Sequence, residues 1–144
     1  LLTDGLELAE ADPFGHGTKM QNLLCQESVG PGWSTTWRHQ EAAVSVRYTG
    51  LSDGMSVATA ESWVSKGKWT YDDLWIPTLM VRNQGPEGLK TRFVGIIEVF
   101  NESPIVRSAQ TTEAGDVGIT LSNGTRDTVR LSENASISVE RENT

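Results

Sequence analysis

The stretch "WIPTLMVRNQGPEGLKTRFVGIIEVF", residues 75–100, is the most apolar part of the chain and decides the fold class. Two apolar segments flank a charged loop that contains glycines. The second segment carries apolar side chains on both faces of an expected strand: Phe93, Ile97 and Val99 on one face, and Val94, Ile96 and Phe100 on the other. A strand that is apolar on both sides has to be covered on both sides. We therefore expect a central hairpin, with something packed over the outer face of one of its sheets.

Short segments in which apolar residues alternate with polar ones recur along the rest of the chain. Helical periodicity is nearly absent, and Val, Ile and Thr dominate these segments. The dipeptide Asn123-Gly124 is a strong hairpin signal between two of them. About eight or nine short strands at this spacing predict an all-β fold, an antiparallel β-sandwich that forms a single domain over residues 1–144. The expected strands cover 33–39, 43–48, 55–64, 77–83, 91–100, 105–111, 117–122, 125–132 and 135–140. The first 28 residues are weakly patterned and predict no clear element.

Composition and charge exclude several classes of partner. At 144 residues the chain is long enough for one domain with a real core. The net charge of −7 makes nucleic acids and anionic membranes poor partners, because polyanions are gathered by basic surfaces. No apolar run approaches the roughly 18 residues of a membrane-spanning helix. The chain opens without an initiator Met or signal-peptide features, and we expect it to be a C-terminal fragment of a larger protein.

The sequence contains no motif for a metal, a cofactor or a nucleophile. The single cysteine, Cys25, excludes an internal disulfide and has apolar neighbours, so we expect a small buried side chain. No pair of histidines has metal-ligand spacing, and no phosphate-binding loop occurs. The sequons at Asn123 and Asn134 carry little weight, since Asn-Gly is better understood as a turn. We expect neither a metal site nor a cofactor.

Three segments carry a resemblance to a known family. Residues 91–106, "TRFVGIIEVFNESPIV", resemble a strand of the form F-V-S-V-I-E-P followed by a short turn and an apolar strand, with Glu98 at the glutamate and Val99 where Pro is frequent. Residues 30–50 are similar to a W-x-x-x-W strand and the polar strand after it, and residues 117–132 to a closing hairpin. Over residues 21–131 the chain therefore resembles the C-terminal β-sandwich region of heparinase II/III-like proteins, a superfamily of polysaccharide lyases.

The resemblance implies an accessory role. Proteins of this superfamily join an N-terminal (α/α) toroid to the β region and cleave uronic-acid polysaccharides by β-elimination. The toroid carries the main catalytic groups, so the isolated chain is not expected to catalyse, and we assign it no catalytic residue. His16 and His39 are expected to be structural or exposed, and Tyr48 to lie in the core. The resemblance also implies a secreted or periplasmic location, with the toroid and a polysaccharide as partners.

The tryptophans support an alternative from another class. The chain has five Trp, and three of them fall within residues 63–75. Tryptophan faces stack on pyranose rings, so this segment predicts a platform for a stand-alone carbohydrate-binding module. Lys66 and Lys68 offer hydrogen bonds to an acidic sugar, whereas the acidic net charge favours a neutral or weakly charged glycan. The candidate residues are Trp63, Lys66, Lys68, Trp69, Tyr71 and Trp75.

The same tryptophans can instead serve the fold alone. They can cap the core of the sandwich, or they can dock against the toroid. A structural or adhesion domain that binds no glycan is a third, weaker interpretation of the whole chain. Sequence patterns do not separate these alternatives.

Overall fold

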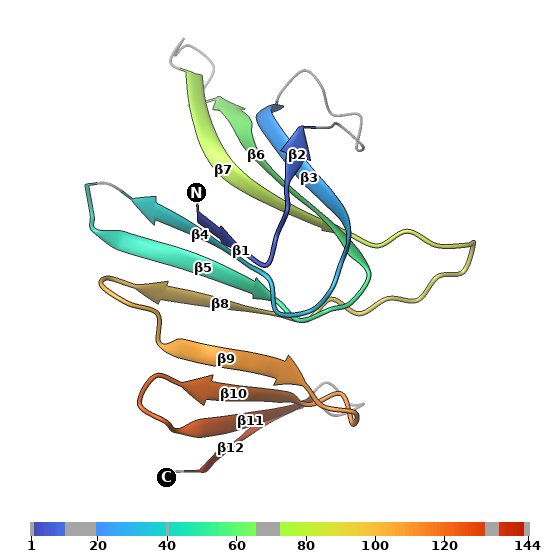
Figure 1. The fold of residues 1–144 in the computed structure, drawn as a ribbon, viewed down its shortest axis with the longest axis vertical. Helices are drawn as coiled ribbons and strands as arrows, with labels where there is room; N and C mark the ends of the chain where they lie inside the picture. The colour runs from blue at the N-terminus through green and yellow to red at the C-terminus, as the bar shows by residue number, and fades with distance from the viewer. Residues whose placement is uncertain (1, 11–19, 40, 66–72, 132–135, 143–144) are drawn as a thin grey trace. The chain divides into compact units, whose positions relative to one another are not determined.

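The computed structural model describes residues 2–10, 20–39, 41–65, 73–131 and 136–142. Over these residues the chain is all-β, with twelve strands in three antiparallel four-stranded sheets and no helix that could cross a membrane (Figure 1). The all-β, antiparallel expectation is confirmed. The strands are β1 (Leu2–Asp4), β2 (Ala9–Glu10), β3 (Met20–Val29), β4 (Ser34–His39), β5 (Val44–Gly50), β6 (Met55–Ser65), β7 (Asp73–Arg82), β8 (Gly95–Phe100), β9 (Val106–Thr111), β10 (Val117–Leu121), β11 (Arg126–Leu131) and β12 (Ile137–Glu142).

The chain forms two compact units. One comprises residues 6–30 and 53–92 and consists of the sheet β2-β3-β6-β7. Strand β6 lies between β3 and β7 in this sheet and is buried on both faces, with Val57 on one face and Ala58 on the other. Strand β7 is at the edge, where Pro77 is tolerated because its missing N–H breaks no ladder on the outer side.

Strand β3 was missed by the sequence prediction, which expected no clear element in the first 28 residues. Its pairing with β6 shifts register twice, between Gln21 and Leu24 and again between Gln26 and Val29. At these two places Asn22 and Ser28 have positive φ angles of 54° and 55°. A bulge inserts a residue into the strand, so the side chains on either side of it no longer alternate in the same phase. The period-two pattern that announces a strand is therefore lost.

The other unit comprises residues 1–5, 31–52 and 93–144 and contains the sheets β1-β4-β5-β8 and β12-β11-β10-β9. Two aromatic rings in it lie over the glycine pair Gly50 and Gly95, which are direct partners across β5 and β8. A Cβ atom on Gly50 would lie 2.3 Å from Cε2 of Trp33, and one on Gly95 would lie 2.3 Å from the hydroxyl oxygen of Tyr48. The two rings are 5.3 Å apart between centroids. Only glycine leaves room for these rings at either position.

The central hairpin predicted from residues 75–100 is wrong. Strand β7 pairs with β6, whereas β8 pairs with β5 and stands at the edge of its own sheet. Ile97 and Val99 on β8 are accordingly 71% and 59% exposed. The connection over residues 83–94 contains no strand and is too long for a tight turn, so the two apolar segments that it joins are free to choose different partners.

The predicted hairpin at Asn123-Gly124 is confirmed. It joins β10 to β11, and the Thr125 N–H donates to the Asn123 side-chain oxygen at 3.0 Å. Gly124 has a φ of 89°, a left-handed conformation that glycine adopts at no steric cost. Strands β9 to β12 thus form a simple meander, and its last strand exposes Ile137 and Val139.

Candidate functional site

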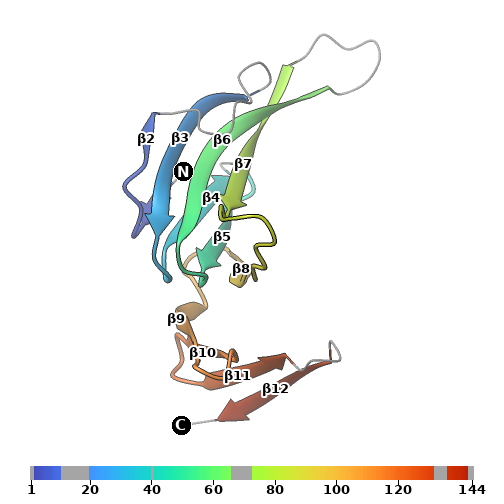
Figure 2. The same cartoon turned by 90° about the vertical axis from the view of Figure 1, so that its right-hand side faces the viewer.

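Two of the predicted platform residues are brought together by the β6–β7 hairpin. Trp63 on β6 is the direct antiparallel partner of Trp75 on β7, so both side chains lie on one face of the sheet. Figure 2 shows the two long strands running side by side. Direct partners have their Cβ atoms about 5 Å apart, close enough for two indole rings to form one aromatic surface. Trp63 is 37% exposed and Trp75 is partly exposed.

The remaining platform candidates, Lys66, Lys68, Trp69 and Tyr71, lie outside the described residues. The platform prediction is therefore tested at neither its lysines nor its middle tryptophan. What the structure adds is the register of the strands that bound this segment, which places Trp63 opposite Trp75.

A polar cluster adjoins the tryptophan pair on the same face. Glu61 is two residues before Trp63 on β6 and pairs with Gln21 on β3 and Pro77 on β7. One carboxylate oxygen of Glu61, Oε2, accepts hydrogen bonds from Nε2 of Gln21 at 2.9 Å and from Nδ2 of Asn22 at 2.8 Å. We name Gln21, Asn22 and Glu61 the amide–carboxylate cluster.

The β3 bulge makes this cluster possible. Two successive residues of a regular strand point to opposite faces, so they do not reach one acceptor. The positive φ of Asn22 at the register shift lets its side chain join that of Gln21 on Glu61. Sequence reasoning missed the cluster, because Gln21 and Asn22 come from the segment without a readable period. The alternation within residues 55–64 does put Glu61 and Trp63 on one face, and this was the available signal.

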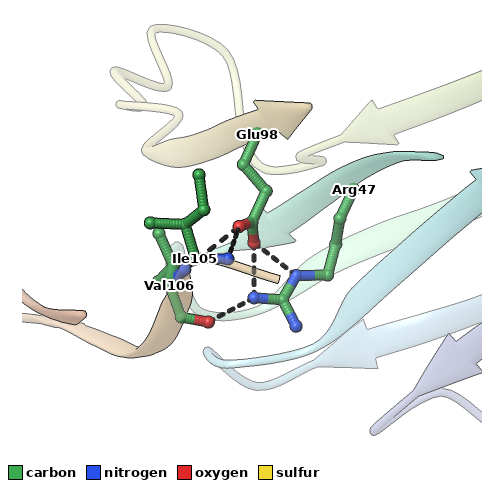
Figure 3. Close-up of polar contacts among 4 residues, drawn as sticks. All are labelled: Arg47, Glu98, Ile105 and Val106. Atoms are coloured by element: carbon green, nitrogen blue, oxygen red, sulfur yellow. Dashed lines mark hydrogen bonds and ion pairs between the residues drawn. The ribbon is translucent and has the colours of Figure 1, made fainter. Parts of the chain in front are cut away.

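A second glutamate cluster lies in the other unit and is built differently (Figure 3). Glu98 on β8 is the direct partner of Arg47 on β5 and forms an ion pair with it. The Arg47 Nε–H donates to Oε1 of Glu98 at 2.6 Å. The other oxygen of Glu98, Oε2, accepts the backbone N–H groups of Ile105 and Val106 at 2.9 and 3.1 Å.

The side chains and backbone groups of the Glu98 cluster form hydrogen bonds with one another. Arg47 also donates to the Val106 carbonyl, so the carboxylate and the guanidinium together tie the start of β9 to strands β5 and β8. The Glu98 side chain is 8% exposed and that of Arg47 is 20% exposed. Every group in the cluster is already engaged with protein, and its role is to hold the turn between β8 and β9.

Two open cavities occur in the unit that contains β9. One, of about 270 Å³, is lined by Asp4, Gly32, Ser34, Arg47, Thr49, Val106, Arg107, Ser108 and Ala109. The other, of about 430 Å³, is lined by residues of β9 to β12 and of the β9–β10 turn. Among the described residues neither lining includes a histidine, cysteine or tyrosine. The titratable side chains that line them are carboxylates and arginines: Asp4, Arg47 and Arg107 in the first cavity, and Arg126, Asp127 and Glu142 in the second.

Of the other titratable residues considered from sequence, the structure describes His39, Tyr48 and Cys25. His39 is exposed at the end of β4, and its Nδ1 accepts the Ala42 N–H at 3.1 Å within the turn to β5. Tyr48 is half-buried, and burial raises the pKa of its hydroxyl. Cys25 is buried, as expected, and His16 lies outside the described residues. The described part of the chain holds no group of three metal-ligating side chains.

Scans against protein-family models, curated proteins and solved structures find no match to this chain. The resemblance of residues 91–106 to heparinase II/III-like proteins thus stays a prediction. A function has to be inferred from the fold and from the two glutamate clusters.

Proposed function

We propose that the chain is an accessory β-sandwich module of a heparinase II/III-like polysaccharide lyase. In this proposal an (α/α) toroid elsewhere in the parent protein carries the catalytic groups, and the β module supports the toroid and borders it. The substrate is a uronic-acid polysaccharide, which the toroid cleaves by β-elimination. The chain itself performs no chemistry.

The Glu98 cluster is the observation that carries this proposal. Glu98 is the glutamate of the segment in which the resemblance is strongest, and its contacts give it a physical task. An apolar residue at this position would leave Arg47 and two backbone N–H groups without an acceptor at a largely buried site. A glutamate in this motif is therefore understandable as a requirement of the β8–β9 turn, which supports a shared fold.

The sandwich arrangement of the sheets is part of the same proposal. Strand β6 is buried on both faces between Met55 and Ala60, which a sheet with one face in solvent does not provide. Each face of β6 therefore needs a covering layer. In a β-sandwich the facing sheet is such a layer. The exposed apolar side chains of β12 are a separate matter, and in this proposal another part of the parent protein contacts them.

The proposal is tested by measuring unsaturated uronate, the product of β-elimination, by ultraviolet absorbance. We expect the polypeptide encoded by the whole gene to release this product from a uronate polysaccharide, and this chain alone to release none. A whole-gene polypeptide without a helical toroid, or turnover by this chain alone, would overturn the proposal.

A stand-alone carbohydrate-binding module is the second candidate function. The pairing of Trp63 with Trp75 on one sheet face favours it, because two adjacent indoles offer a surface on which pyranose rings stack. Titration of the intrinsic Trp fluorescence with a panel of oligosaccharides tests it. A saturable change supports binding, and a flat response across the panel rejects this candidate.

A further inference from the structure

We propose that the face of β3, β6 and β7 carrying the Trp63–Trp75 pair and the amide–carboxylate cluster binds an uncharged pyranose chain. This inference rests on the second candidate function and specifies its site and its class of ligand. It adds three residues, Gln21, Asn22 and Glu61, to the tryptophans considered from sequence.

The apolar part of the site is a strip formed by Trp63 on one strand and by Trp75 and Pro77 on the next, on one face of the sheet. Trp63 faces Trp75, and the next pair on the same face is Glu61 with Pro77. Pro77 is exposed, so its ring extends the surface of Trp75 along the edge of the sheet. Pyranose rings have apolar C–H faces that pack on such aromatic and proline rings. A chain of sugars suits this strip better than a single ring does, because the strip extends over two successive pairs of the ladder.

The polar part of the site is rich in hydrogen-bond acceptors. Both hydrogen bonds that Glu61 accepts from the amides of Gln21 and Asn22 go to Oε2, and neither uses Oε1. The amide oxygens of Gln21 and Asn22 are acceptors as well. Sugar hydroxyl groups are donors, and a hydroxyl that donates to an ionised carboxylate forms one of the stronger hydrogen bonds available. The cluster therefore matches hydroxyl groups held beside a stacked ring.

The charge of the site selects against acidic sugars. Among the described residues Glu61 makes no ion pair, and its carboxylate is bonded to the neutral amides of Gln21 and Asn22, whereas Glu98 is paired with Arg47. A uronate or sulfate group placed beside it would meet a like charge. The net charge of −7 acts in the same direction. The expected ligand is thus a neutral glycan, in contrast to the uronate substrate of the proposed parent lyase.

The test is a fluorescence and calorimetric titration of the folded chain with cellohexaose, mannohexaose and hexagalacturonate. We expect at least one neutral hexamer to bind and the hexagalacturonate to bind at least about 10-fold more weakly. Trp75→Ala and Trp63→Ala should each weaken the neutral ligand about 10-fold or more, because each removes half of the aromatic surface. Glu61→Gln should weaken it about 3- to 10-fold and reduce the discrimination against hexagalacturonate.

Ile76→Ala is the matched control. Ile76 neighbours Trp75 on β7, is 41% exposed and lies on the opposite face of the sheet, so its removal should leave affinity unchanged. Circular dichroism verifies that each variant is folded, and Glu61→Gln, which is nearly isosteric, tests the site without removing a ring.

Three results would count against the inference. If no hexamer binds, the carbohydrate-binding function itself fails. If hexagalacturonate binds as well as or better than the neutral hexamers, binding stands but the inference fails, and Lys66 and Lys68 become the residues to change. An affinity that survives both tryptophan variants also overturns the inference.

Discussion

Each of the two units contains a tryptophan and a glutamate whose burial and hydrogen-bond partners can be compared, and the two pairs differ. In the unit with β5 and β8, Trp33 is 2% exposed and lies against Gly50, and Glu98 is engaged by an arginine and two backbone N–H groups. In the unit with β6 and β7, Trp63 is 37% exposed, and Glu61 is held by two neutral amides.

The difference shows that partners and burial decide the role of a residue type. The Trp33 and Glu98 side chains are buried, and both carboxylate oxygens of Glu98 accept hydrogen bonds within the fold, so neither residue presents a free surface to a ligand. Trp63 keeps part of its side chain exposed, and the hydrogen bonds that Glu61 accepts from Gln21 and Asn22 both go to one of its two oxygens. What each side chain still offers to solvent thus separates Trp33 and Glu98, which serve the fold, from Trp63 and Glu61, for which binding is proposed.

The largest effect that separates the two sites is expected for tryptophan removal. Trp33→Ala should lower the free energy of unfolding by about 4 kcal/mol, because it opens a large void beside Gly50. Trp63→Ala should cost less than about 1 kcal/mol, the scale of a cross-strand pair contact. Urea unfolding monitored by circular dichroism measures both. Equal losses for the two variants would remove the distinction between a core ring and a platform ring.

Substitution of the two glutamates should also lower the free energy of unfolding unequally, with a smaller difference than for the two tryptophans. Glu98→Ala leaves Arg47 and two backbone N–H groups unpaired, and we expect a loss of about 3 kcal/mol. Glu61→Ala should lose less than about 1 kcal/mol, since its amide partners are exposed and regain water. The same urea experiment tests this pair of variants. A Glu98→Ala protein as stable as the parent would show that the turn between β8 and β9 needs no clamp.

A third carboxylate, that of Asp127, is expected to have the smallest effect, which is a dependence of protein stability on pH. Arg141 Nε and Nη2 donate to the two oxygens of Asp127 at 2.7 Å each, and these hydrogen bonds lower the pKa of Asp127. A lowered folded-state pKa stabilises the protein above the unfolded pKa of Asp, about 3.9, and this contribution is lost as the pH falls through the folded value.

The Asp127→Asn variant should therefore have a lower melting temperature than the unaltered chain at pH 7. This difference in melting temperature should disappear under strongly acidic conditions. Thermal melts of both proteins across this pH range provide the measurement. A gap that stays constant from pH 7 to pH 2 would mean that Asp127 contributes through packing and not through its charge.

Local signals in the sequence predict the strands well where the ladder is regular. The strand expected over residues 43–48 corresponds to β5, and Asn123-Gly124 marks the turn between β10 and β11. Tyr48, which was expected in the core, is only half-buried, and Val46 on the same face is 36% exposed. Strand β3 fails because its two bulges interrupt the alternation. The prediction of a hairpin over residues 75–100 is wrong for another reason, because apolar content indicates that a segment is a strand but not which strand it pairs with.

The tryptophans of the candidate site could be predicted from the sequence, whereas the amide–carboxylate cluster could not, because it depends on which strands pair. Trp63 and Trp75 stand out by residue type, and their approximate spacing suits a hairpin. Gln21 reaches Glu61 only through the β3–β6 pairing, which is a long-range contact without a local signature. Side chains from distant strands enter a site through sheet register, and one sequence alone gives no access to it.

Pro77 has a consequence for how the molecule behaves in solution. An exposed outer strand is a template on which a second polypeptide can add by hydrogen bonding, the first step toward fibrils and swapped dimers. A ring nitrogen without hydrogen interrupts the row of donors along β7, so an incoming strand finds no continuous ladder. The residue that extends the aromatic strip also guards the chain against self-association along this border.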